Sequence, residues 1–209
     1  SNRLKIDANA VEAITGSGLT ASVVASLAYL LLAQRESAGI GTFGARLEQW
    51  VSPRSGTPQL ARIVDVLERS GPGGPADIPA ALSDLAARLE RRSLAVVVSD
   101  FFCDVDLLRV SLARLRHARH EIVLLRVLDE DEIEFPFTGW LRMNGLEGEG
   151  ARTCEAAVVR QRYRQAFDTH EKRLHDACRA SQVEMHMMPT IRPVGEALVA
   201  FLNHRAAIS

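Results

Sequence analysis

The clearest pattern in the chain is an uninterrupted apolar run over residues 94–98 that ends on Ser99 and Asp100. A short run without alternation, rich in β-branched valine, is typical of a strand that is buried on both faces. A second run of this kind covers residues 122–128. Strands of this type belong to parallel sheets covered by helices, so both runs predict strands of such a sheet.

Apolar residues at helical spacing surround these two runs. They predict helices over residues 19–34, 57–67, 78–89, 105–115, 159–174 and 194–202, and further strands over 4–7, 38–43, 46–51 and 183–188. Strands that alternate with helices favour right-handed crossovers and an α/β fold. We therefore predict a doubly wound, mostly parallel central sheet with helices on both faces, in which the more polar 46–51 strand forms an antiparallel edge.

One segment breaks this alternation. Residues 135–154 contain Phe135, Phe137 and Trp140 followed by a glycine-bounded turn over 145–150, which predicts an inserted β-hairpin. Because clustered aromatic side chains usually pack, we expect these three to be buried, with an exposed contact surface as the alternative.

Composition adds mainly exclusions. With 25 basic and 26 acidic residues the formal charge is −1, which does not favour nucleic acid or an anionic membrane. A basic group at Arg109, Arg114, Arg116 and Arg119 is expected to be the solvated face of a helix. Three cysteines without metal-ligand spacing favour a reducing, cytoplasmic location.

Size and apolar content bear on the organisation of the chain. The 209 residues are enough for a single domain spanning 1–209. The sequence predicts no membrane-spanning helix and no signal peptide, since the longest apolar segment, 19–33, is short for a bilayer. The first residue is not Met, so we expect a fragment of a longer protein. In that case the sheet edge at Asp100 could pack against the remainder of the protein.

Two acidic residues end predicted strands, Asp7 after 4–6 and Asp100 after 94–99. If these strands are neighbours, both carboxylates lie at the carboxyl edge of the sheet, where α/β folds bind ligands. Two carboxylates suit Mg²⁺, to which Asn9 could add an amide oxygen, and the hydroxyls of Ser17, Thr20 and Ser99 are near in sequence. The simpler alternative is that each aspartate caps the helix that follows.

Taken together, four segments resemble a von Willebrand factor A-like domain: residues 4–11, 27–30, the 73–78 loop and Val98-Ser99-Asp100-Phe101-Phe102. More narrowly, the chain is similar to the bacterial family of unknown function that usually accompanies MoxR-type AAA+ ATPases. The similarity continues through 120–125, Leu128-Asp129, 134–137 and 198–205, and so covers most of the chain.

The resemblance implies a metal-ion-dependent adhesion site. Asp7 and Asp100 match its two aspartates, and Asn9 stands in place of its first serine. Val11 replaces the second serine and Ala76 replaces the threonine, so the site Asp7, Asn9 and Asp100 is degenerate, either empty or holding Mg²⁺ weakly. The resemblance also implies a non-enzymatic protein-interaction role, with an AAA+ ATPase as the partner in assembly or remodelling of protein complexes.

An enzymatic alternative remains open at this stage. Asp100 with Asp7 could serve a magnesium-dependent phosphohydrolase, although Asp104 is better explained as a helix cap and no phosphate-binding loop accompanies it. The acidic residues 129–132 form a predicted loop at the same sheet edge, either solvated or half of an electrostatic contact.

Overall fold

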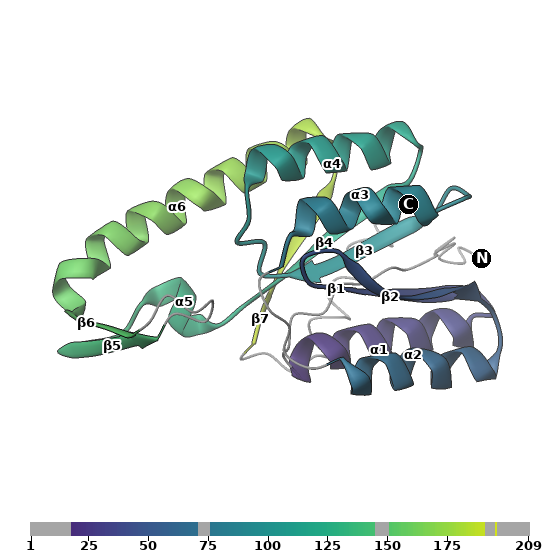
Figure 1. Cartoon of the computed structure of the whole chain (residues 1–209), viewed down its shortest axis with the longest axis horizontal. Helices are drawn as coiled ribbons and strands as arrows, with labels where there is room; N and C mark the ends of the chain where they lie inside the picture. Colours follow the sequence, from purple (N-terminus) through teal and green to yellow (C-terminus); the bar gives the residue numbers. More distant parts are fainter. Residues whose placement is uncertain (1–17, 71–75, 145–150, 191–194, 196–209) are drawn as a thin grey trace.

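Three parallel strands form the sheet at the centre of the structure, a computed structural model that describes residues 18–70, 76–144, 151–190 and Gly195 (Figure 1). Strand β4 (Glu121–Leu128) lies between β3 (Leu94–Ser99) and β7 (Glu184–Pro189). All of β3 is buried, as is β4 except for its first residue. The two continuous apolar runs are therefore the buried parallel strands that the sequence predicts.

Alternate side chains of the sheet enter two separate hydrophobic clusters. Leu94, Val96 and Val98 pack with helices α1 (Gly18–Ala33) and α2 (Thr57–Arg69). Ala95 and Val97 point the other way, toward α3 (Ile78–Arg88), α4 (Val105–His117) and α6 (Ala156–Ala180). Helices thus cover both faces of the parallel sheet, because successive residues of a strand face opposite sides.

Two antiparallel strands, β1 (Ala38–Phe43) and β2 (Leu47–Arg54), form a separate ladder. Every residue of β1 is buried, whereas β2 has only half-buried and exposed positions, as its more polar sequence predicts. Among the described residues these strands pair only with each other. The mixed α/β character is therefore established, while the continuous doubly wound sheet that we predict is not shown.

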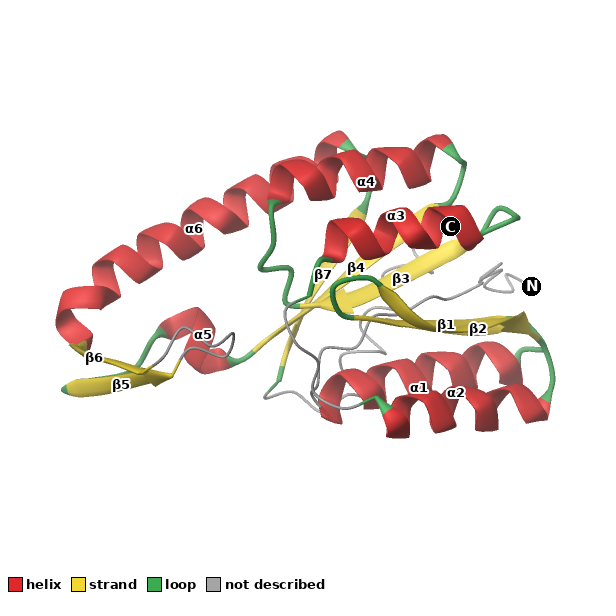
Figure 2. Ribbon diagram, viewed as in Figure 1, coloured by secondary structure: helices red, strands yellow, loops and turns green. Residues whose placement is uncertain are grey.

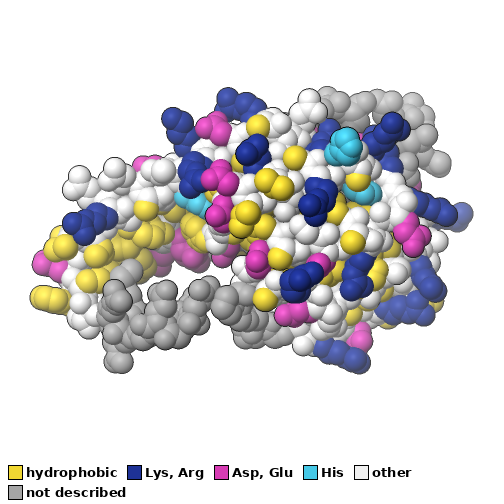
Figure 3. Space-filling model, turned by 45° about the horizontal axis from the view of Figure 1, so that its top comes forward, with side chains coloured by type: hydrophobic (Ala, Val, Ile, Leu, Met, Phe, Trp, Pro, Cys, Tyr) yellow, Lys and Arg dark blue, Asp and Glu magenta, His cyan; other side chains and the backbone are white. Residues whose placement is uncertain are grey.

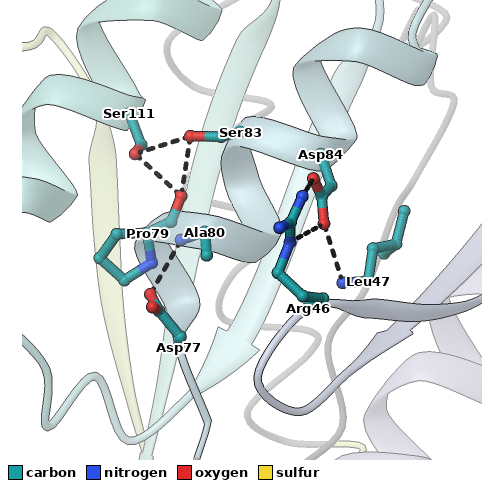
Figure 4. Close-up of polar contacts among 8 residues, drawn as sticks. All are labelled: Arg46, Leu47, Asp77, Pro79, Ala80, Ser83, Asp84 and Ser111. Carbon is teal, nitrogen blue, oxygen red and sulfur yellow. Dashed lines mark hydrogen bonds and ion pairs between the residues drawn. The ribbon is translucent and has the colours of Figure 1, made fainter.

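Polar contacts join helix α3 to α4 on one side and to the β1–β2 turn on the other (Figure 4). Asp77 caps α3 by accepting a hydrogen bond from the backbone N–H of Ala80 at 2.9 Å. The Ser111 hydroxyl of α4 donates to the Pro79 carbonyl at 3.0 Å. On the other side, Arg46 from the β1–β2 turn forms an ion pair with Asp84, with 2.7 Å between Nε and Oδ2.

The Arg46–Asp84 pair gives a prediction for acid titration. The Arg46 guanidinium lowers the pKa of Asp84 to about 2, so this pair stabilises the fold fully above the ordinary pKa of 3.8 and is lost as the pH falls through about 2. Arg46→Gln should therefore raise the pKa of Asp84 toward 3.8, measured by carboxyl NMR titration.

The matched control for that titration is Arg88→Gln, since Arg88 is the weakest of the groups that lower the pKa of Asp84. It should raise that pKa less than Arg46→Gln does. Equal shifts in the two variants would mean that the ion pair is not the main cause.

The remaining elements project away from the sheet, at the left of Figure 2. Strands β5 (Trp140–Asn144) and β6 (Ala151–Glu155) form an antiparallel pair where the sequence predicts a hairpin, and the N-terminal half of α6 follows it directly. Helix α5 (Glu130–Glu134) replaces the acidic loop predicted at 129–132. We call residues 130–144 and 151–168 the arm.

The acidic residues form a helix because two of them complete a capping box. The Asp129 side chain accepts from the backbone N–H of Asp131 at 2.9 Å, and Glu132 accepts from the backbone N–H of Asp129 at 3.0 Å. Three acidic residues in the first turn also interact favourably with the helix dipole.

Several predicted elements lie outside the described residues: the strand at 4–7, the 145–150 turn and, except for Gly195, the helix at 194–202. No helix in the ranges that the structure describes combines the length and the apolar character needed to cross a bilayer.

Candidate functional site

Asp100 lies at the carboxyl end of β3, as predicted, in a tightly hydrogen-bonded loop. Its Oδ1 accepts a hydrogen bond from the backbone N–H of Phe102 at 3.0 Å, and the buried Ser99 hydroxyl accepts from the N–H of Phe101 at 3.2 Å. Phe101 has a left-handed backbone, with φ of 56°. The aspartate is half-buried, and one of its carboxylate oxygens already holds the turn. We call residues 99–102, at this edge of the sheet, the rim.

The neighbouring groups are engaged in local structure. Asp104 caps α4 by accepting from the N–H groups of Asp106 at 2.9 Å and Leu107 at 3.1 Å, as the sequence predicts. Burial, together with the carboxylates of Asp100 and Asp104, raises the pKa of the Cys103 thiol to about 12. Cys103 is therefore protonated at neutral pH and is a poor nucleophile and metal ligand.

Arg126 of β4 holds the Asp100 loop through a hydrogen bond to the loop backbone. This side chain is wholly buried, with 0% of its surface exposed, and its Nε donates to the Asp100 carbonyl at 2.8 Å. The guanidinium forms an ion pair with Glu171 of α6 and lies over two aromatic rings, 5.2 Å from the centroid of Phe102 and 5.6 Å from that of Phe167. Burial lowers the pKa of Arg126, while the nearby Asp100 carboxylate raises it.

Helix α6 contacts the same loop through His170. The ring Nε2 donates to the Phe101 carbonyl at 2.9 Å, and the ring lies 5.6 Å from that of Phe102. Burial lowers the pKa of His170, so the neutral imidazole is favoured. The Asp100 rim is thus fixed by β4 and α6 as well as by its own strand.

Aromatic rings continue from this rim into the arm. Neighbouring centroids lie 4.8 to 6.3 Å apart along what we call the aromatic row: Phe102, Phe167, Tyr163, Phe135 and Phe137. The Tyr163 hydroxyl donates to the Glu132 carbonyl at 2.6 Å and so attaches α5 to α6.

The aromatic side chains of the arm only partly follow the prediction of burial. Phe135 is buried, but Phe137 is 38% exposed and Trp140 is 76% exposed. For these two, the alternative of an exposed contact surface describes the structure better. The physical reason is that the hairpin projects away from the sheet and has little core to pack against.

The predicted metal ligands can be placed only in part. Asp7, Asn9 and Ser17 lie outside the described residues, Thr20 is buried on α1, and Ser99 is used within the Asp100 loop. In the part of the chain that the structure describes, no three His, Cys, Asp or Glu side chains are grouped as a metal site. Asp100 alone does not supply the oxygen ligands that Mg²⁺ needs, so the described residues do not by themselves fit this ion.

A crevice of about 340 Å³ lies elsewhere, near the start of β3. Its lining includes Trp50, Ser52, Arg88 and Arg91. It does not include Asp100 or any other residue of the rim.

Sequence reasoning missed the residues that fix the rim, which are Arg126, His170 and Glu171. Arg126 was detectable, since it is the only charged residue inside the apolar run 122–128. A charge in a fully buried strand requires a partner, although the identity of that partner depends on the packing of α6.

Comparisons with known proteins give a family and a fold. Residues 12–175 match the family described as "Protein of unknown function DUF58". The uncharacterized protein Rv1480 of Mycobacterium tuberculosis is 30% identical over 147 residues, which are 70% of this chain but 42% of that protein. The chain thus spans less than half the length of the curated relatives it matches.

Two solved structures are similar in fold. One is an aerotolerance-related membrane protein from Bacteroides fragilis, with a TM-score of 0.58 and 12% identity. The other is the conserved hypothetical protein BatB from Bacteroides thetaiotaomicron, with a TM-score of 0.53 and 9% identity. Each alignment covers 96% of this chain and 98% of the other, and at these identities the similarity concerns the fold alone.

Proposed function

We propose that this chain, which belongs to the DUF58 family of proteins of unknown function, is a non-enzymatic protein-interaction domain whose contact face is the rim around Asp100. The observation that carries the proposal is the fixation of this rim by Arg126 and His170. A strand end whose backbone carbonyls are held by buried side chains is pre-organised for recognition, since little conformational entropy is lost on binding.

The side chains near the rim support binding over catalysis. Asp104 and Asp129 are engaged as helix caps, the Cys103 thiol is protonated, and the Nε2 of His170 is bonded to a backbone carbonyl. A general base or nucleophile needs a proton-accepting atom directed at the substrate. Asp104 and Asp129 are instead engaged at helix N-termini, and His170 holds the loop.

The finer features of the proposal come from the resemblance to von Willebrand factor A-like domains. In this view Asp7, Asn9 and Asp100 form a degenerate adhesion site, and the partner is a MoxR-type AAA+ ATPase that assembles or remodels protein complexes in the cytoplasm. Because Val11 and Ala76 stand where hydroxyl ligands would be, partner binding is expected to be largely independent of a metal ion.

A binding measurement tests this function. The chain is titrated with a MoxR-type AAA+ ATPase of the same organism by calorimetry, with and without EDTA. We expect binding to survive the chelator and to be lost in Asp100→Lys, since a reversed charge at the centre of a contact costs several kcal/mol. Glu68→Lys on the exposed side of α2 is the control and should bind normally.

Two outcomes of that titration would contradict the proposal. Binding that is unaffected by Asp100→Lys would move the contact face elsewhere, and loss of binding in EDTA would show a metal-dependent contact. The phosphohydrolase alternative is tested with the same protein, because hydrolysis of a phosphate monoester with Mg²⁺, abolished by Asp100→Asn, would replace an interaction role by an enzymatic one.

A further inference from the structure

The arm exposes aromatic side chains where a soluble domain would normally cover them. Trp140 is 76% exposed and Phe137 is 38% exposed, at the end of the molecule where Figure 3 shows hydrophobic side chains gathered beside acidic ones. Tryptophan is the residue type most enriched among the energetic centres of protein contacts. The arm therefore has the composition of a contact surface.

The charge next to these aromatics is of one sign. Helix α5 presents Glu130, Asp131 and Glu134, all exposed, and none of them forms an ion pair with a residue that the structure describes. Glu132 and Asp129 add two more carboxylates that hold the capping box. An apolar surface beside unneutralised acidic groups fits a partner surface that is both apolar and basic.

Helix α4 carries such a surface. Leu107 and Val110 are 56% and 53% exposed, the exposed Arg114 follows Val110 by one turn, and Arg109, also exposed, directly precedes Val110 in sequence. Leu107, Val110 and Arg114 are spaced by three and four residues and so share one stripe of the helix. A helix face that only contacts water gives no reason for two neighbouring exposed apolar residues.

These two surfaces do not meet within one chain. Helix α4 is joined to α6 by the Asp106–Arg173 ion pair at 2.8 Å, whereas the hairpin lies beside Ala156, whose N–H donates to the Gly139 carbonyl. Residues 156 and 173 are 17 positions apart, which corresponds to about 25 Å of helix. Figure 1 likewise places α4 beside the C-terminal half of α6 and the hairpin at its other end.

We infer that the arm of one copy of this chain packs on the exposed face of α4 in a second copy. Trp140 and Phe137 would cover Leu107 and Val110, while the carboxylates of α5 face the arginines of α4. If made reciprocally, the two contacts close a two-fold dimer. The inference does not depend on the proposed function, because the Asp100 rim takes no part in it.

Charge reversal with mixing tests the contact. The arm-reversed variant carries Glu130→Lys, Asp131→Lys and Glu134→Lys, and the helix-reversed variant carries Arg109→Glu and Arg114→Glu. By analytical ultracentrifugation over a concentration series, the wild-type chain should exceed the 22.9 kDa of a monomer, and each variant alone should remain at that mass. An equimolar mixture should associate again, because each arm then meets an α4 of opposite charge.

Further variants separate this contact from general effects. Trp140→Ser should raise the dissociation constant about tenfold or more without changing the circular dichroism spectrum. Arg62→Glu with Glu68→Lys, two exposed changes on α2, should associate like the wild type. A wild-type chain that keeps its monomer mass at every concentration would overturn the inference and leave the arm to another partner. A mixture that stays monomeric while both folded variants are monomers would overturn it as well.

Discussion

Replacing Glu171 with leucine is expected to lower the free energy of unfolding by about 3–5 kcal/mol. The change leaves the Arg126 guanidinium, which has no exposed surface, without its counter-charge. An unpaired charge in such a site costs far more than the pair itself contributes, since desolvation is no longer offset. The measurement is equilibrium denaturation in urea at neutral pH.

The control for this variant lies two residues away on the same helix. Arg173 forms an exposed ion pair with Asp106, so Arg173→Leu should cost no more than about 1 kcal/mol. The double variant Arg126→Met with Glu171→Leu should recover most of the loss, because it removes both charges. If the single Glu171→Leu variant were as stable as the wild type, the ion pair would not be the group that holds Arg126.

Leu108→Ala is expected to destabilise the chain by about 2–5 kcal/mol. Leu108 is fully buried on the inner face of α4, in the cluster that also contains residues of α3, β3 and β4. Truncation leaves a cavity that the rigid sheet cannot close, so the lost contacts are not replaced. Thermal and urea unfolding at low protein concentration measure the effect.

The adjacent residue provides the comparison for Leu108. Leu107 is 56% exposed on the outer face of α4, and Leu107→Ala should change the free energy of unfolding by no more than about 0.5 kcal/mol. Similar losses in both variants would contradict the orientation of α4 described here.

The sequence was most informative where burial alone decides the structure. The apolar runs at 94–98 and 122–128 predicted two strands of the parallel sheet, and helical spacing predicted α4 and α6. The Asp104 cap is predictable because a side-chain cap is a local interaction. Residues 129–132 differ from the predicted loop, because the Asp129–Glu132 capping box starts a short helix there.

The candidate site was less predictable than the fold. The position of Asp100 after a buried strand makes it predictable from the sequence. The Arg126–Glu171 ion pair behind it is not predictable, because these two residues are 45 positions apart and meet only through the packing of α6. The exposure of Trp140 was also not predicted. A pattern of aromatic residues cannot show whether a hairpin folds onto the core or projects from it.

Helix α6 is a single uninterrupted rod of 25 residues, about 37 Å long, whose buried residues beyond Ala156 all lie in its C-terminal half. Glu171, which pairs with Arg126, belongs to the same rod, 15 positions after its first residue. Tilting of this rod would pull on the same guanidinium that holds the Asp100 carbonyl. The orientation of the arm and the position of the Asp100 loop are therefore linked through one helix.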